Sequence, residues 1–511
     1  MRTWGSCLLL LAGLVSASLA GLCLPADVLY PVDILLITTS DWTDVRLVGA
    51  TLVIDGYEVV DGGDATNLNI STAGGLSVSR AIEGDMRVEV RFRGYFAQIS
   101  GSWVRIEVQK GHLGNTTVSF LPRDGTTPTA FASYIHRGVA PGSSQANQRT
   151  FSLAVSQITS RIEPWVLPAP SESSIGGQKV LAFYYPWYGS PDGPSDEWVH
   201  WNPLRANRDS THVPAAGYYD SLDPETVRRH IGQAKEAGID GFIASWWGLH
   251  TFEDRAFGVL LEAAEQEDFL VTVYYESAEL YSQIVSDVSA IVSRYASSPA
   301  FLVVDGLPAI FFYVRVISKF TVEEWERAFE MLDQRNRSIF AIADSLDPRY
   351  LEAFEGLHTY NPVAMTMETT AELYRSASLA ARMKGNLFAA TVLPGYEEAV
   401  YRPTSPRADR DGGDTYHAYW DLAKASKPHW ILITSFNEWH EGSEIEPSVE
   451  FGTHYLEQTL REAAAWRAGE AIPDEPAPIP VGDSGDRDGD GVPDSEDFCP
   501  DWPGDPTMNG C

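Results

Sequence analysis

The chain has 511 residues, 44% of them hydrophobic, which suffices for two or three globular domains with apolar cores. It carries 70 acidic and 37 basic residues, a formal net charge of −33. This excess of negative charge argues against nucleic acid or an anionic membrane surface as the main partner, because both would repel it.

The N-terminus has the features of an export signal. Arg2 precedes an apolar run over residues 7–15, and the small residues Ser18 and Ala20 follow. This order is typical of a secretory signal peptide, so we expect residues 1–20 to be removed and the protein to be secreted or held at the cell surface. A membrane anchor is the alternative, but the run is short for a span. No other segment is long and apolar enough, so no membrane span is expected after cleavage.

Residues 21–163 are predicted to form an all-β, sandwich-like domain. Apolar and polar residues alternate in short runs such as 86–92 and 103–108, and clusters of Gly, Asp and Asn separate the runs. Alternation with frequent turns is typical of antiparallel sheets. The domain is either a glycan-binding module or a structural or dimerisation module, and the sequence favours neither. Residues 164–177, rich in Pro, Ser and Gly, are predicted to be a linker.

From residue 178 to 468 short apolar runs alternate with longer helical patterns. The apolar runs are residues 180–185, 241–246, 270–275, 308–313, 339–343, 356–360, 387–392 and 430–434. Asp223-Pro224 and the capping box Thr321 to Glu324 mark two helix starts. Eight strand–helix units predict a (β/α)₈ barrel. A doubly wound open sheet is the alternative, but no Gly-rich dinucleotide turn follows the first strand.

In such a barrel, functional side chains lie at the C-terminal ends of the strands. Aromatic and acidic residues, together with one amide, occupy these positions here, namely Tyr184, Tyr185, Trp246, Glu276, Tyr313, Asp344, Tyr360, Asn437 and Glu438. Aromatic faces stack on sugar rings, and carboxylates accept hydrogen bonds from hydroxyls or move protons. One such aromatic residue is more often part of the core, but the recurrence at strand ends indicates a sugar site.

The segment after the eighth strand concentrates acidic groups. Four Glu and one His lie within residues 438–446, including Glu438 and Glu441. Glycoside cleavage needs two carboxyl groups in one site, and their proximity raises the pKa of one of them, which can then donate a proton. A surface acidic loop or a metal site are the alternatives. The usual spacing of metal ligands is absent, so no metal is expected to take part in catalysis.

This segment also resembles a known family. Residues 433–442, Ile-Thr-Ser-Phe-Asn-Glu-Trp-His-Glu-Gly, resemble the signature of glycoside hydrolase family 99, the endo-α-mannosidases and endo-α-mannanases. Residues 182–189 with His200-Trp201 resemble the first-strand motif of that family, and residues 394–396 and 402–403 resemble a further segment. The resemblance covers roughly residues 181–447. It implies a retaining, endo-acting hydrolase.

The resemblance also implies roles for single residues. Glu438 would deprotonate the 2-hydroxyl of the sugar, whose oxygen attacks C1 to give a 1,2-anhydro sugar. Glu441 would act as general acid and then as general base for water. Glu276, Tyr360 and Trp246 are similar to positions that contact substrate in the family.

Tyr185, Asn437 and His440, which belong to the same motifs, complete the predicted substrate-binding set. Two departures from the family pattern concern the substrate: Ser277 replaces the expected Pro, and residues 361–363 differ from the expected loop. The alternatives are a glycosidase acting on another α-linked polysaccharide and a non-catalytic, secreted glycan-binding protein.

The C-terminus has a distinct composition. Residues 469–485 are predicted to form a Pro-rich linker to a tail over residues 486–511. The tail places carboxylates at loop positions 1, 3, 5, 9 and 12 of a calcium loop, namely Asp486, Asp488, Asp490, Asp494 and Asp497, with Gly491 at position 6. With Cys499-Pro500 behind it, the tail resembles a thrombospondin type 3 repeat, which implies structural Ca²⁺ and a tethering role. A solvated acidic tail is the alternative.

Overall fold

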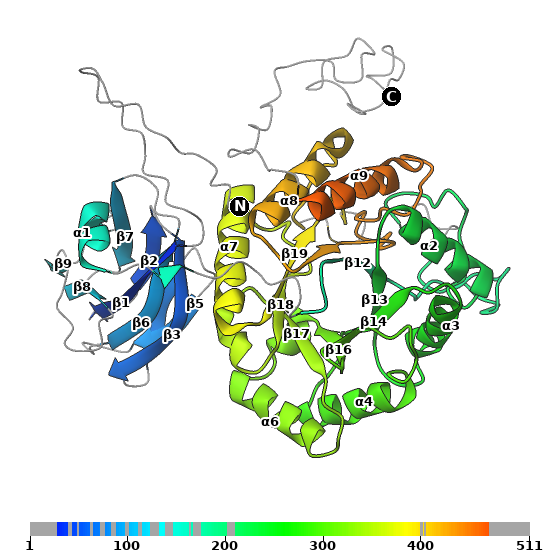
Figure 1. The fold of residues 1–511 in the computed structure, drawn as a ribbon, viewed down its shortest axis with the longest axis horizontal. Coiled ribbons are helices and arrows are strands. Elements are labelled where there is room, and N and C mark those ends of the chain that lie inside the picture. Colours follow the sequence, from blue (N-terminus) through cyan, green and yellow to red (C-terminus); the bar gives the residue numbers. More distant parts are fainter. Residues whose placement is uncertain are drawn as a thin grey trace, which may run out of the picture.

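The computed structural model describes residues 28–38, 43–48, 51–61, 65–71, 77–82, 88–97, 102–110, 115–122, 132–137, 147–162, 165–166, 175–201, 210–398, 402 and 405–469 (Figure 1). The predicted signal peptide, almost all of the Pro-rich linker and the predicted calcium tail lie outside these residues. The domain boundaries given above therefore stay predictions. In the part of the chain that the structure describes, no helix has the length and apolar character needed to cross a membrane.

The N-terminal region consists of strands in two sheets. One sheet has the order β3-β6-β1-β8-β9, with β11 paired to β1, and the other has the order β10-β7-β2-β4-β5. The bounds are β1 Val28–Thr38, β2 Thr43–Val48, β3 Thr51–Asp61, β4 Ala65–Ser71, β5 Ser77–Ile82, β6 Val88–Ala97, β7 Trp103–Lys110, β8 Asn115–Pro122, β9 Ala132–Arg137, β10 Asn147–Ala154 and β11 Trp165–Val166, with helix α1 at Val155–Arg161. The sandwich arrangement of these sheets stays a prediction.

Eight parallel strands close into a barrel in the second half of the chain. They are β12 Lys179–Tyr184, β13 Gly241–Trp246, β14 Leu270–Tyr275, β16 Leu307–Phe312, β17 Phe340–Asp344, β18 Gly356–His358, β19 Leu387–Val392 and β20 Trp430–Ile433. Pairing of β12 with both β13 and β20, and of β14 with β16, closes the ring. The short strand β15 Val303–Val304 adds antiparallel to β16. The prediction of a (β/α)₈ barrel is confirmed.

Helices surround this ring (Figure 1). They are α2 Pro224–Glu236, α3 Phe252–Gln266, α4 Tyr281–Arg294, α5 Val314–Ile317, α6 Val322–Asp333, α7 Met367–Lys384, α8 Asp414–Ala425 and α9 His454–Ala468, with short 3₁₀ turns η1 Pro348–Glu352 and η2 Asp411–Gly413. Both predicted helix starts are confirmed. The Asp223 side chain accepts from the amides of Glu225 and Thr226, and Thr321 and Glu324 form the capping box.

Side chains alternate between the two faces of each barrel strand. On β13, Ile243 belongs to the cluster inside the barrel, whereas Phe242 and Trp246 belong to the cluster between the strands and the helices. On β14, Tyr274 points inward and Tyr275 outward in the same way. Because the side-chain period of a strand is two, this parity decides which residues at the strand ends reach a site above the barrel.

The N-terminal sheets lie against one side of the barrel. Strand β3 runs beside helix α7 (Figure 1). Leu29 and Ala97 of the β region are fully buried in the same apolar cluster as the outer layer of the barrel. The β region is therefore packed on the barrel through apolar contacts.

Candidate active site

A cavity of about 890 Å³ opens where the barrel strands end. Its aromatic walls are Tyr185, Trp187, Trp201, Trp247, Tyr313, Tyr360 and Tyr396. Its charged and polar groups are Glu253, Glu276, Glu398, Glu438, Glu441, His200, His440, Arg315, Arg402 and Asn361. Apolar faces combined with a few converging polar groups are typical of a sugar-binding site. Of the predicted residues, Tyr185, Glu276, Tyr360, Glu438, His440 and Glu441 meet in this cavity.

Glu438 lies at the floor of the cavity, in the loop that follows β20. Its side chain is 2% exposed, and its Oε1 accepts a 3.1 Å hydrogen bond from the amide of His440. Its own amide donates to Oγ of Ser435 at 2.8 Å. Among the described residues, Oε2 has no hydrogen-bond partner. Burial, reinforced by the negative charge of Glu441, raises the pKa of the Glu438 carboxyl well above its ordinary value.

Glu441 contributes the second carboxyl of the predicted pair. The hydroxyl of Tyr360 donates a 2.8 Å hydrogen bond to its Oε2, and Tyr396 also bonds to it. Burial raises the pKa of Glu441 to about 7, although the Tyr360 hydrogen bond favours the charged form and opposes the shift. The pKa values of Glu438 and Glu441 are thus both raised, and interacting carboxyls of this kind titrate as a pair.

Glu276 adds a third carboxyl, at the end of β14. Its side chain is 8% exposed, and its Oε1 has no partner among the described residues. Burial raises its pKa to about 8, while a hydrogen bond with Ser245 lowers it. Glu276 is thus largely protonated near neutral pH and is able to donate to a sugar hydroxyl.

His440 and a set of stacked rings form one wall. Trp187 and His200 stack with a centroid distance of 4.5 Å and an angle of 4° between their planes. Nε2 of His440 lies 3.4 Å from Nδ1 of His200, and the Tyr185 ring lies 4.7 Å from that of Trp187. This wall offers a flat aromatic face in the same cavity as Glu438 and Glu441.

The structure places Trp246 outside the cavity, so this predicted substrate contact is corrected. Trp246 is fully buried, and its Nε1 donates a 3.0 Å hydrogen bond to Asp254 at the start of α3. The next residue, Trp247, is 37% exposed and lines the cavity, with its Nε1 bonded to Oγ of Ser245 at 3.0 Å. The physical reason is strand parity, which directs even-numbered residues of β13 toward the helices.

Asn437 is also absent from the cavity wall. It is fully buried, and its Oδ1 accepts a 2.7 Å hydrogen bond from the amide of Tyr185. Its Nδ2 donates to the carbonyl of Tyr185 at 3.2 Å and to the hydroxyl of Tyr219 at 3.1 Å. Asn437 therefore fixes the backbone of a cavity residue, and a direct contact with substrate is not supported.

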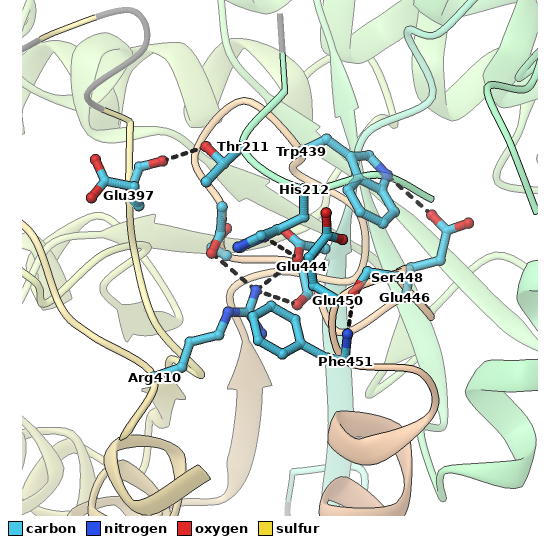
Figure 2. Close-up of polar contacts among 12 residues, drawn as sticks. Thr211, His212, Glu397, Arg410, Trp439, Glu444, Glu446, Ser448, Glu450 and Phe451 are labelled. Carbon is cyan, nitrogen blue, oxygen red and sulfur yellow. Dashed lines mark hydrogen bonds and ion pairs between the residues drawn. The ribbon is translucent and has the colours of Figure 1, made fainter. Parts of the chain in front are cut away.

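A buried ion cluster holds the loop that carries the two glutamates (Figure 2). Nη2 of Arg410 donates to the carbonyls of Gly442 and Glu444 at 3.0 and 2.8 Å, and to Oε1 of Glu444 at 2.8 Å. Nδ1 of His212 lies 2.7 Å from the same Oε1. Burial alone would raise the pKa of Glu444, but the charges of His212 and Arg410 overcome it and the pKa is lowered. The loop is thus anchored by charge-assisted contacts.

Gly442 allows the loop to turn directly after Glu441. Its φ is +57°, and an added Cβ would lie 3.1 Å from the carbonyl oxygen of Glu397 and 3.2 Å from Cβ of Thr211. Oγ1 of Thr211 donates to that same carbonyl at 2.7 Å (Figure 2). A side chain at position 442 would be strained and would press on both neighbours.

Trp439, which lies between Glu438 and Glu441 in the sequence, is held by a second set of contacts, around Glu446. Its Nε1 lies 3.2 Å from Oε2 of Glu446 (Figure 2). The Tyr219 hydroxyl donates to the same oxygen at 2.8 Å, and Nε2 of the buried His230 lies 3.0 Å from Oε1. The loop between Glu438 and Glu441 is therefore fixed on both sides.

Several cavity residues were not selected from the sequence. They are Trp187, His200, Trp201, Trp247, Glu253, Arg315, Asn361, Tyr396, Glu398 and Arg402, with Tyr313 noted as a strand end only. The alternation of side chains along β13 would have indicated Trp247. The family motif at residues 394–396 and 402–403 would have indicated Tyr396 and Arg402. Among the described residues, no cluster of three or more His, Cys, Asp or Glu side chains is arranged to hold a metal ion.

Comparison with known proteins agrees with this geometry. The model of glycosyl hydrolase family 99 matches residues 177–459. A glycoprotein endo-alpha-1,2-mannosidase of Rattus norvegicus is 26% identical over 317 residues, covering 53% of this chain and 68% of the relative. A glycoprotein endo-alpha-1,2-mannosidase-like protein of Mus musculus is 26% identical over 329 residues, covering 55% of this chain and 72% of the relative.

Among solved structures, the GH99 endo-alpha-mannosidase from Bacteroides thetaiotaomicron is similar to this chain. It has a TM-score of 0.52 and 27% sequence identity, and the match covers 57% of this chain and 98% of that structure. The family match spans all eight barrel strands and includes Glu438 and Glu441. The chain belongs to glycosyl hydrolase family 99 and is a glycoside hydrolase.

Proposed function

We propose that this protein is a retaining, endo-acting hydrolase that cleaves α-mannosidic linkages in mannan or other mannose-containing glycans. The observation that carries the proposal is the presence of the buried Glu438 and the partly buried Glu441 in one cavity, both with raised pKa values. The relatives named above as endo-alpha-mannosidases support the choice of linkage.

In the first step the Glu438 carboxylate takes the proton of the 2-hydroxyl at the cleaved sugar. O2 attacks C1, the bond from C1 to the leaving oxygen breaks, and Glu441 gives its proton to that oxygen. The product is a 1,2-anhydro sugar. In the second step water attacks C1 and loses a proton to Glu441, while O2 recovers its proton from Glu438. Two inversions at C1 give net retention.

The electrostatics of the cavity support this scheme. The negative charge of Glu441 adds to burial in raising the pKa of Glu438, and burial raises the pKa of Glu441 to about 7, so a carboxyl proton is available in the cavity near neutral pH. Oε2 of Glu438 is buried and has no hydrogen-bond partner among the described residues, so a hydrogen bond from the 2-hydroxyl would satisfy it. Glu441 is already bonded by Tyr360, which orients it.

We also propose that the chain is exported and that its tail binds Ca²⁺ through Asp486, Asp488, Asp490, Asp494 and Asp497. Both proposals rest on the sequence: the apolar N-terminal segment and the spacing of the aspartates. The Pro-rich linker would separate the tail from the barrel, so its role would be structural or one of tethering. EDTA should therefore leave glycan cleavage nearly intact, and loss of cleavage would contradict that separation.

The deciding experiment incubates the purified chain with α-mannan and short α-mannosyl oligosaccharides and follows the products by NMR. Early release of an α-configured oligosaccharide is expected, since endo cleavage with retention produces it. Glu438→Gln and Glu441→Gln should each lose several orders of magnitude in rate while remaining folded. Retained activity in either variant would remove the role given to that residue.

A folded protein that releases nothing from any mannoside would exclude mannose as the sugar at the cleaved bond. Cleavage of another α-linked polysaccharide would then identify a glycosidase with the same pair and a different substrate. Saturable glycan binding without cleavage, unaffected by both glutamine substitutions, would identify a non-catalytic binding protein.

A further inference from the structure

A second cavity, of about 410 Å³, adjoins the catalytic one. The two cavities share three lining residues: Tyr313, Tyr360 and Asn361. From there the second cavity extends over the loops that follow β16, β17 and β18. It contains neither member of the catalytic pair, and no step of the proposed reaction uses it.

The junction between the cavities offers unused hydrogen-bond donors. The hydroxyl of Tyr313 and the side-chain nitrogen of Asn361 make no hydrogen bond to any other residue that the structure describes. Oδ1 of Asn361 accepts a 2.9 Å hydrogen bond from the amide of Val363, which fixes the orientation of the side chain. A hydroxyl and an amide so placed suit a ligand rich in hydroxyl groups.

A buried carboxylate makes the shared wall rigid. Asp344, 3% exposed at the end of β17, accepts at Oδ2 from the Tyr274 hydroxyl at 2.8 Å and from the amide of Val314 at 3.1 Å. Its Oδ1 accepts from the amide of Tyr360 at 2.8 Å. One side chain thus connects the backbone of Val314, in the second cavity, to that of Tyr360, which lines both.

The remaining walls of the second cavity combine apolar and polar groups. The apolar ones are Val314, Leu346, Met365 and Leu373, and the polar ones are Ser345, Asp347 and Thr359. A sugar ring presents both C–H faces and hydroxyls, so it is complementary to a surface of this mixture. A purely apolar ligand would leave the polar groups at the junction unsatisfied.

We propose that the second cavity is a distal subsite that binds a further sugar residue of the same glycan chain. The inference rests on the proposed function, since the occupant is the substrate whose bond the catalytic pair cleaves. Continuity through Tyr313 and Asn361 lets one chain occupy both cavities at once. The enzyme then prefers substrates long enough to reach beyond Asn361.

The test compares kcat/KM for α-mannosyl oligosaccharides of increasing length. The wild type should gain about tenfold between the shortest substrate that it cleaves and one longer by two sugars. Val314→Trp would fill the subsite with an indole and bring that ratio close to one. The matched control is Val303→Trp, because Val303 is 44% exposed against 43% for Val314 and lies at the other end of β16. It should keep the wild-type ratio.

A second variant tests the subsite independently, in case Val314→Trp does not fold. Asn361→Ala removes a donor without adding volume, and it should lower the ratio between long and short substrates as well. A wild type that cleaves short and long mannosides equally well would overturn the subsite while leaving the proposed function standing. A wild type that cleaves no mannoside would overturn both. Equal loss on short and long substrates in both variants would also count against the subsite.

Discussion

The hydroxyl of Tyr360 donates a 2.8 Å hydrogen bond to Oε2 of Glu441, whose pKa burial raises to about 7. The bond favours the carboxylate, so its removal in Tyr360→Phe should raise that pKa further. Glu441 would then keep its proton to higher pH. In the proposed mechanism Glu441 is the general acid, so the alkaline limb of the kcat/KM profile should move to higher pH.

Tyr313→Phe is the control for this measurement, because Tyr313 lines the same cavity and makes no hydrogen bond to Glu441 among the described contacts. Its alkaline limb should stay close to that of the wild type. An alkaline limb that stays in place or moves to lower pH in Tyr360→Phe would contradict this effect of the hydrogen bond on the pKa of Glu441.

Two adjacent tryptophans should respond in opposite ways to truncation. Trp247 lines the cavity and is 37% exposed, so Trp247→Ala should lower kcat/KM at least about tenfold with little loss of stability. Trp246 is fully buried, so Trp246→Ala should cost about 3–5 kcal/mol in the free energy of unfolding. Steady-state kinetics and urea unfolding separate the two. If Trp246→Ala and Trp247→Ala lose the same kcat/KM and the same free energy of unfolding, the assignment of Trp247 to the cavity and Trp246 to the core is refuted.

Much of the barrel could be predicted, because strands buried on both faces appear in a sequence as short continuous apolar runs. The predicted runs 241–246, 270–275 and 387–392 coincide with β13, β14 and β19. The error at Trp246 arose because its position at the strand end and the resemblance to the family do not give the face of the strand on which its side chain lies. Counting alternate residues from Ile243 would have directed attention to Trp247.

Other parts of the site depend on contacts between distant segments. His212 meets Glu444 and Asn437 meets the backbone of Tyr185, and each pair is more than two hundred residues apart in the chain. No local pattern around Asn437 distinguishes a residue that contacts substrate from one that positions a neighbour. That distinction needs the fold, because it depends on which side chains surround the amide.

Glu276 should make the stability of the protein depend on pH. Its pKa is about 8 in the folded protein, against an ordinary value of 4.5, so folding favours the protonated form. The stability that it contributes is fully present below 4.5 and is lost as pH rises to about 8. Glu276→Gln, which mimics the protonated acid, should therefore be more stable than the wild type at pH 9, by a few kcal/mol at about 1.4 per pKa unit.

Near pH 5 the difference between Glu276→Gln and the wild type should be small. Urea unfolding at both pH values measures the effect, and Glu279→Gln provides a control because its side chain is 80% exposed. If the stability of Glu276→Gln relative to the wild type does not change between pH 5 and pH 9, the raised pKa of Glu276 is refuted.

The buried contacts of the loop that carries Glu438 and Glu441 should make substitutions at two arginines differ in their effect on the free energy of unfolding. Arg410 is 8% exposed, contacts the buried Glu444, and lies 4.6 Å from the ring centroid of Phe451. Arg410→Met keeps the length and the apolar contacts but removes one of the two cationic partners of the buried Glu444 carboxylate, which should cost about 3–5 kcal/mol. The exposed Arg407 pairs with Glu397 and Asp409, so Arg407→Met should cost less than about 1 kcal/mol. Similar unfolding midpoints in urea for the two variants would show that the loop does not depend on the buried pair.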